Sequence, residues 1–420
     1  MAVVIKGSGS IEGSTGLEMG ANGTTEIRGQ VNVALGSSVA GDSYTSGIST
    51  ASNFTPTSIP TSNRNLIING AMQVAQRATS STSNGYKTID RWYYECNGAD
   101  EAATIAQADV TADSTPWNLG FRKCLKVTNG NQTGGAGSSD AIDLVYAVEA
   151  QDLATSGWDY TSTSSYITFS FWIKSSVAQN FYGYMRSQDG TSKDYAYETG
   201  SLTADTWTKV TKTVPGDSGL TVTNDNGKGL AITILPFMGT GSTNNSKSLN
   251  SWANIDNSAR TPDNTSTWWT TNDATFEITG VQLEVGSVAT PFEHRSYGDE
   301  LLRCQRYYQV VVRGSDYGSG IAPICMVHGY QANNAFGVVD LPVTMRAEPS
   351  LDAVSSTAYW KVFRNAGSGD FNSLQLDQCS NSHVELNFYG VSSGTSIAQN
   401  TNGWARSNDS SAFIGLQSEL

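Results

Sequence analysis

Three histidines, His294, His328 and His383, are the side chains of this sequence that could act as a base near neutral pH. None of them has a histidine, cysteine or carboxylate partner at the spacing of a metal site. The sequence has no serine-hydrolase elbow, phosphate-binding loop, dinucleotide fingerprint or zinc-protease motif, and its acidic residues are too scattered to nominate the facing carboxylates of a glycan-cleaving enzyme. We therefore expect no catalytic residues and predict that the protein is not an enzyme.

The cysteines do not indicate a metal site or a disulfide framework. They are odd in number, widely spaced and without a CxxC pair: Cys96, Cys124, Cys304, Cys325 and Cys379. We expect reduced and mostly buried thiols.

Two loops, at residues 188–190 and 224–227, contain the Asn, Asp and Gly residues that calcium sites use. Neither loop is followed by the carboxylate that closes an EF-hand site, and tight turns with a positive φ are the preferred interpretation. We expect no metal and no other cofactor.

Four tryptophans stand outside clean strand patterns and could bind a ligand. Trp268 and Trp269 lie in a run of Ser, Thr and Asn, where two neighbouring residues of one strand cannot both face the core. Trp360 and Trp404 also stand among small polar residues. Because an exposed indole face is a good platform for a sugar ring, we predict all four as glycan-stacking residues. The competing interpretation, which is the commoner use of such residues, is that each closes the end of a β-sandwich.

The composition shows which elements must position these residues. Hydrophobic residues make up 38% of the 420 residues and charged residues only 15%, with 42 glycines. Helix surfaces normally carry more Glu, Lys, Arg and Ala, so short strands joined by polar turns are predicted instead. With 38 acidic against 25 basic side chains the net charge is −13, which disfavours binding to nucleic acid or to anionic membranes.

The chain divides into four parts. Residues 1–64 have short apolar pieces separated by Gly and then a Ser- and Thr-rich linker, and we predict an oligomeric attachment region; a disordered arm is the alternative. Residues 65–296 show recurring strand patterns typical of a β-sandwich. Residues 297–308 permit two helical turns, with Asp299 as a candidate N-cap, and 309–420 are predicted to form a smaller β domain.

The clearest strand pattern runs over residues 166–174. Ile167, Phe169, Phe171 and Ile173 alternate with polar residues and Trp172, which is the period of two that places one set in the core. Other strands are expected at 124–127, 144–148, 207–214, 230–237, 276–285 and 335–341. Pro236 is expected at a strand end or on an edge strand, because it cannot donate to a ladder.

The N-terminal sequence MAVVIKGSGS has too short an apolar run for a signal peptide, and no stretch of about 18 apolar residues occurs. We expect a soluble protein that is made in a cytoplasm and does not insert into membranes.

Three stretches resemble a recurrent module of phage tail-fibre and related virion proteins, especially those of marine and cyanobacterial phages. They are Asn65–Arg77 with Thr88–Trp92, Ile278–Ser287 with Ala289–Glu293, and Asp299–Tyr308, and the segment Leu341–Arg346 commonly follows them. The residues themselves read as framework, with paired first and last strands and the charged residues Asp90 and Arg91 beside a buried Trp92.

The resemblance implies a jelly-roll sandwich similar to carbohydrate-binding modules, in a virion protein that leaves the cell by lysis. It implies a fibre or spike subunit, usually a homotrimer, that attaches to a host surface glycan. We expect residues 1–64 to contact other virion proteins and residues 309–420 to form or flank the distal tip. Two alternatives stay open: a purely structural capsid or baseplate part, and a glycan depolymerase.

Overall fold

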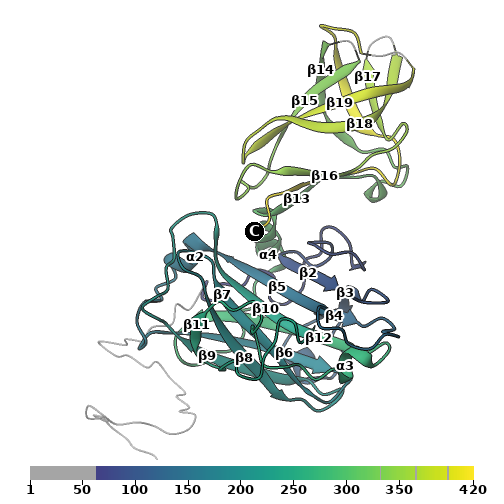
Figure 1. The fold of residues 1–420 in the computed structure, drawn as a ribbon. Coiled ribbons are helices and arrows are strands. Elements are labelled where there is room, and N and C mark those ends of the chain that lie inside the picture. The colour runs from purple at the N-terminus through teal and green to yellow at the C-terminus, as the bar shows by residue number, and fades with distance from the viewer. Residues whose placement is uncertain (1–62, 332, 365–366, 395–396) are drawn as a thin grey trace, which may run out of the picture. The chain divides into compact units, whose positions relative to one another are not determined.

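A computed structural model describes residues 63–331, 333–364, 367–394 and 397–420, which belong to one compact unit. The predicted attachment region at residues 1–64 lies outside the described residues except for its last two positions. Within the described ranges, strands dominate and helices are few and short (Figure 1). The prediction of an all-β protein is confirmed.

Residues 80–285 form two six-stranded sheets that pack face to face as a jelly-roll-like sandwich (Figure 1). Every strand pair within them is antiparallel. The first sheet has the order β1 (Ser80–Ser81), β3 (Thr104–Asp109), β4 (Lys123–Thr128), β12 (Thr275–Val285), β6 (Tyr166–Ser175) and β9 (Thr208–Pro215). The second sheet has the order β11 (Trp252–Asn254), β8 (Lys193–Ser201), β7 (Asn180–Ser187), β10 (Lys228–Met238), β5 (Ala141–Glu149) and β2 (Trp92–Asn97).

The sandwich core follows the alternation that the sequence predicts. In β6, Ile167, Phe169, Phe171 and Ile173 have no exposed surface and pack in one cluster with side chains of the second sheet. The intervening Trp172 lies half-buried on the outer face of the first sheet. A period of two therefore identified correctly which side of β6 faces the core.

Pro236 lies two residues before the end of its strand. It is inside β10, a strand with a hydrogen-bonded neighbour on each side, β7 and β5. The pairing of β10 with β5 shifts register between Ile234 and Phe237, so a bulge surrounds the proline. The expectation of an edge strand was wrong for β10 as a whole, whereas the expectation of a strand end is nearly met, because the pairing with β7 stops at Leu235. At Pro236 itself the bulge releases the ladder hydrogen bond that proline cannot make.

The predicted connector is a helix, α4 (Tyr297–Gln305). Its N-cap is Ser296 and not Asp299: the Ser296 hydroxyl accepts a hydrogen bond from the Asp299 amide at 3.1 Å and donates to the Asp299 carboxylate at 2.7 Å. Serine thus satisfies a free amide of the first turn, and Asp299 adds a negative charge there. The other helices are short: α1 (Thr115–Asn118), α2 (Ala150–Ala154), α3 (Thr267–Thr270) and the 3₁₀ turn η1 (Gly314–Asp316).

The C-terminal part contains a small sheet and a closed barrel with their own core. The three-stranded sheet has the order β13 (Tyr308–Arg313), β21 (Phe413–Gln417) and β16 (Ser350–Val354). The barrel has the order β14 (Pro323–Gln331), β15 (Asn334–Asp340), β19 (His383–Gly394), β18 (Gly367–Cys379), β17 (Trp360–Arg364) and β20 (Asn402–Ser407). Closure leaves no strand of the barrel with an unpaired edge.

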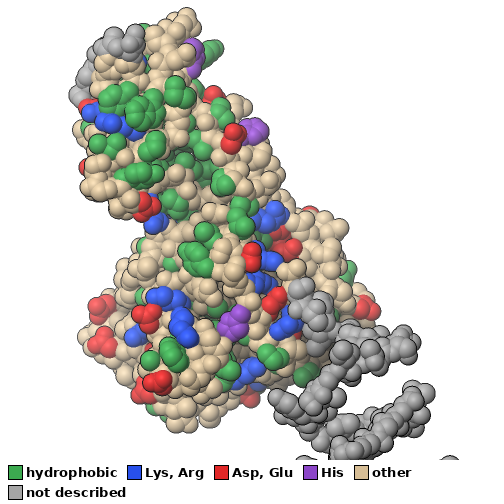
Figure 2. All heavy atoms as spheres, turned by 180° about the vertical axis from the view of Figure 1, so that it is seen from behind, with side chains coloured by type: hydrophobic (Ala, Val, Ile, Leu, Met, Phe, Trp, Pro, Cys, Tyr) green, Lys and Arg blue, Asp and Glu red, His purple; other side chains and the backbone are tan. Residues whose placement is uncertain are grey.

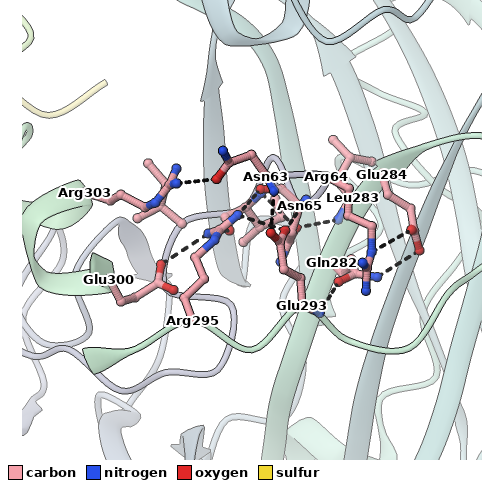
Figure 3. Close-up of polar contacts among 12 residues, drawn as sticks. Asn63, Arg64, Asn65, Gln282, Leu283, Glu284, Glu293, Arg295, Glu300 and Arg303 are labelled. Carbon is pink, nitrogen blue, oxygen red and sulfur yellow. Dashed lines mark hydrogen bonds and ion pairs between the residues drawn. The ribbon is translucent and has the colours of Figure 1, made fainter. Parts of the chain in front are cut away.

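The motifs that resemble the virion module form a partly buried polar framework (Figure 3). Glu293 accepts hydrogen bonds from the amides of Asn63 at 2.5 Å and Asn65 at 2.8 Å. Arg295 donates to the Asn65 and Ile67 carbonyls and pairs with Glu300 of α4 at 3.5 Å. These contacts fix the start of the sandwich to the end of β12 and to α4, so the framework interpretation of the motifs holds.

The Asp90–Arg91–Trp92 motif has three different environments. Trp92 is buried, as expected. Asp90 accepts hydrogen bonds from Gln76, and burial raises its pKa to about 6. Arg91, which is 1% exposed, pairs with Glu419 at 2.8 Å. The two adjacent charges therefore serve separate contacts.

The five cysteines are all free thiols. Cys124 and Cys304 are buried, whereas Cys96, Cys325 and Cys379 are only partly buried. The expectation of reduced thiols agrees with the structure, and the expectation that most are buried does not.

Candidate functional site

Trp268 and Trp269 are not exposed platforms. Both have 0% exposure and belong to the sandwich core. They lie in α3, one turn of helix, where neighbouring residues can both turn inward; the Asn129 amide holds the turn by donating to the Trp269 carbonyl at 2.6 Å. The Trp269 ring stacks on Phe237 with centroids 4.8 Å apart. The prediction that these two residues stack on a glycan was wrong, because it assumed an extended strand.

Trp360 is also buried, with 0% exposure inside the barrel. Its indole N–H donates to the Ser355 hydroxyl at 2.9 Å, and its ring lies 6.2 Å from that of Phe388. The polar residues near Trp360 in the sequence include Ser355, which accepts the indole hydrogen bond, so they do not indicate that the ring is exposed. Trp360 is therefore a core residue, and its predicted ligand role was wrong as well.

Trp404 differs from the other three because it is 42% exposed. It lies on the outer wall of the barrel, paired in register with Met326 of β14 and with Phe363 of β17. Its ring is 5.7 Å from that of Phe363, and the Arg406 guanidinium lies 4.0 Å from the Phe363 ring centre. Trp404 stays a candidate for ligand stacking.

A groove of about 660 Å³ lies beside this tryptophan on the barrel wall. Figure 2 shows hydrophobic side chains at the surface of the barrel on the face that it draws. The groove is formed by side chains of five strands, β14, β15, β18, β19 and β20, namely Met326, Val327, His328, Tyr330, Phe336, Gly337, Val338, Asp377, Glu385 and Asn402. We call this surface the barrel groove.

The apolar part of the barrel groove is unusually open to solvent. Met326 is 69% exposed, Tyr330 65% and Val338 56%. Tyr330 meets the ring of Phe336 edge to face, with centroids 6.0 Å apart. Because β14 alternates, Met326, His328 and Tyr330 all project from the same side of the strand, away from the barrel interior. An apolar surface of this kind, rimmed by polar groups, marks a site of interaction.

The polar part of the groove consists of hydrogen-bonding groups. His328 Nδ1 lies 3.0 Å from Asn402 Oδ1, and since that oxygen only accepts, Nδ1 donates and Nε2 is left to accept. Partial burial, together with the charge of Asp377 and a hydrogen bond to it, raises the pKa of Glu385. The ten lining residues include two carboxylates and no lysine or arginine. The lining residues thus offer acceptors for hydroxyl groups and no cation, while Arg406 lies outside them, 5.9 Å from the centre of the Trp404 ring.

The remaining histidines lie elsewhere. His294 is on the sandwich, where its Nε2 donates to the Leu119 carbonyl at 2.9 Å, and His383 contacts the Ser382 hydroxyl at 3.1 Å.

Among the described residues, no group of three or more His, Cys, Asp and Glu side chains is arranged to hold a metal. In the loop at 224–227 the Asp225 carboxylate accepts the Gly227 amide at 2.8 Å, as in a tight turn.

The sequence did contain one signal for the groove. From Cys325 to Tyr330 the residues alternate between small or apolar ones and the larger Met326, His328 and Tyr330. The period of two was visible, but which set faces the barrel interior depends on strands that lie up to about 80 residues away in the chain, such as β20.

In the part of the chain that the structure describes, no helix is long and apolar enough to span a bilayer.

No protein-family model matches the chain, and no curated protein matches it. Solved structures with some likeness include the enzymatically active domain of bacteriophage CBA120 tailspike protein 4, at 12% identity and TM-score 0.29, over 53% of this chain and 21% of that one. A CBM4 carbohydrate-binding module has 12% identity and TM-score 0.27, over 52% and 98% of the two chains. The tandem CBM22 domain of Paenibacillus barcinonensis Xyn10C has 10% identity and TM-score 0.24, over 78% and 93%. At these scores the likenesses carry no argument about function.

Proposed function

We propose that this protein is an attachment protein that binds a neutral saccharide in the barrel groove. The observation that carries the proposal is the combination, in one hollow of about 660 Å³, of exposed apolar and aromatic side chains with uncharged or acidic acceptors. Pyranose rings offer an apolar face for stacking and hydroxyl groups for hydrogen bonds. Tyr330 and the neighbouring Trp404 supply the first kind of contact, and His328, Asn402 and Glu385 the second.

Binding without cleavage is the preferred form of this proposal. Asp377 and Glu385 are the two carboxylates of the groove, and they lie close enough for the charge of Asp377 to raise the pKa of Glu385. Glycoside hydrolysis needs two carboxyl groups about 5 Å or more apart with the scissile bond between them. Two carboxyl groups that perturb each other at such close range leave little room for a scissile bond between them.

A glycan array of neutral oligosaccharides, followed by calorimetry on the best ligand, tests the proposal. Truncating a stacking residue should cost about tenfold in affinity, which corresponds to about 1.4 kcal/mol. We expect that loss for Tyr330→Ala and Trp404→Ala. Tyr317→Ala is the matched control, because Tyr317 is 44% exposed on the same C-terminal part but does not line the groove.

Two results would contradict the proposal. If no neutral saccharide binds, or if Tyr317→Ala weakens binding as much as Tyr330→Ala, the barrel groove is not the site. Shortened oligosaccharide products after incubation would instead favour the depolymerase.

A structural role is the second candidate, and the exposure of Met326, Tyr330 and Val338 favours it, because such a patch also suits contact between copies of the chain. Sedimentation equilibrium separates the two. A homotrimer that Met326→Glu dissociates would assign the patch to self-assembly. A homotrimer that survives this change leaves the patch free for a ligand.

We also propose that the protein works on a virion, with residues 1–64 proximal to the particle and the barrel exposed. The support is the resemblance of residues 65–308 to the phage module. Gold labelling of the barrel in electron micrographs of intact particles tests this placement. Deletion of residues 1–64 should abolish incorporation; a truncated chain that still assembles onto particles would contradict the polarity.

A further inference from the structure

A second hollow, of about 480 Å³, lies on the outer face of the first sheet of the sandwich. It is separate from the barrel groove and shares no residue with it. Aromatic rings from Phe121, Trp172 and Phe292 line it, together with His294 and Lys209. We call it the sandwich pocket. Its volume falls within the range of about 300–1,000 Å³ that is usual for small-molecule sites.

The pocket exists because of a bulge in β12. The pairing of β12 with β6 shifts register between Thr279 and Gln282, and Gly280, within the bulge, has φ +62°. A Cβ at Gly280 would lie 2.6 Å from the Phe121 ring. Only glycine both adopts this conformation readily and lets Phe121 lie against the strand. Bulges that re-aim side chains in this way are common beside functional sites.

The aromatic walls form a layer outside the main core. Phe121 and Phe292 are 4.9 Å apart between ring centroids, and His294 is 5.1 Å from Phe121 and 4.9 Å from Phe292. Phe121 is buried in a cluster of its own, against which Trp172 and Phe292 pack while half-buried. Flat walls of this kind accommodate a ring.

The charges of the sandwich pocket are the reverse of those in the barrel groove. Lys209 of β9 is the cross-strand partner of Trp172 of β6, and it is exposed at the rim. His294 donates through Nε2 to the Leu119 carbonyl, so its Nδ1 is left to accept a hydrogen bond. No Asp or Glu is among the residues that line the pocket, in a chain whose net charge is −13. The pocket therefore favours an anionic ligand, against the field of the whole protein.

We propose that the sandwich pocket binds a hexuronic-acid residue of an acidic polysaccharide. The sugar ring stacks on Trp172 and Phe292, the carboxylate pairs with Lys209, and a hydroxyl donates to His294 Nδ1. This site goes beyond the neutral-saccharide groove, and each of the two proposals can fail without the other because the sites lie on different strands.

Calorimetric titration of the full chain with trigalacturonate, and separately with its fully methyl-esterified form, tests the assignment. The two ligands share their rings and differ in charge. Because Lys209 is exposed at the rim, its ion pair with the carboxylate should change affinity by about twofold to fivefold, and we expect the ester to bind more weakly by about that factor. Lys209→Gln should weaken trigalacturonate by a similar factor and leave the ester unchanged.

Matched variants make the result specific. Lys87→Gln removes the charge of another exposed lysine of the sandwich, outside the pocket, and should change nothing. Trp404→Ala, in the barrel, should also leave trigalacturonate binding intact. Trp172→Ala should abolish binding of both ligands, and circular dichroism checks that this variant is folded. If Trp172→Ala does not fold, the Lys209→Gln result alone decides whether the sandwich pocket binds the uronate.

Three outcomes would overturn the proposal. They are no binding of trigalacturonate at millimolar concentration, equal binding of acid and ester, and a Lys209→Gln variant that binds as tightly as the wild type.

Discussion

The reassignment of Trp269 from ligand platform to core residue makes a quantitative prediction. Its side chain has 0% exposure, stacks on Phe237 at 4.8 Å and donates from its indole nitrogen to the Gly135 carbonyl at 2.9 Å. Truncation of a buried tryptophan costs about 3–5 kcal/mol, including the cavity. The lost ring pair and the carbonyl left without its donor place Trp269→Ala toward the upper end, at about 4–5 kcal/mol.

That loss is a large part of the free energy of unfolding of a typical domain, which is about 5–15 kcal/mol. Trp269→Phe keeps a stacked ring and loses the hydrogen bond, so it should cost less, about 1–2 kcal/mol. Trp404→Ala is the matched exposed case and should change stability by no more than about 1 kcal/mol.

Urea unfolding of the full chain, combined with hydrogen exchange of the β10 amides, measures these differences in the sandwich. Exchange of β10 reports the sandwich separately from the barrel, which matters because a chain with two cores need not unfold in one step. If Trp269→Ala were as stable as the wild type, or if Trp404→Ala were the more destabilised variant, the burial argument would be refuted.

Three further predictions concern charge and capping. Burial raises the pKa of Asp143 to about 7, so its contribution to stability is present below the unfolded pKa near 3.8 and is lost as pH rises toward 7. In urea titrations, the stability of Asp143→Asn relative to the wild type should therefore rise by on the order of 2 kcal/mol between pH 5 and pH 8. A difference that does not change with pH would contradict this. Glu284, with 0% exposure, accepts a hydrogen bond from the Thr290 amide at 2.8 Å. Glu284→Ala should lower the free energy of unfolding, measured in urea, by about 3 kcal/mol or more. A loss below about 1 kcal/mol would show that the network of Figure 3 contributes little to stability. Ser296→Ala removes the N-cap of α4 and should cost about 1 kcal/mol, seen as faster exchange of the Asp299 amide; unchanged exchange would mean that the cap is dispensable.

Several features of the fold were determined by the sequence alone. Strand patterns such as that of β6 follow from the geometry of the extended backbone, in which successive side chains point to opposite faces. Hydrophobic alternation therefore identified β6 and its buried face without knowledge of any partner strand. The helical connector was likewise visible from its local periodicity, although its N-cap is Ser296 and not the predicted Asp299.

The tertiary structure decided where the tryptophans and the bulged proline lie. Trp269 is buried by Phe237 and Gly135, which come from distant parts of the chain, and its neighbouring Ser and Thr residues carry no information about those contacts. Pro236 is tolerated in a central strand by a bulge that forms only when β10 pairs with β5.

The candidate sites depended on the tertiary structure to the same extent. The barrel groove joins His328 of β14 to Asn402 of β20, two residues that meet only when the barrel closes. The sandwich pocket needs Phe121 beside Gly280, about 160 positions apart in the sequence. A local pattern reports the direction of a side chain relative to its own strand, whereas a binding surface is made of side chains from several strands, and only the folded sheet order brings those together.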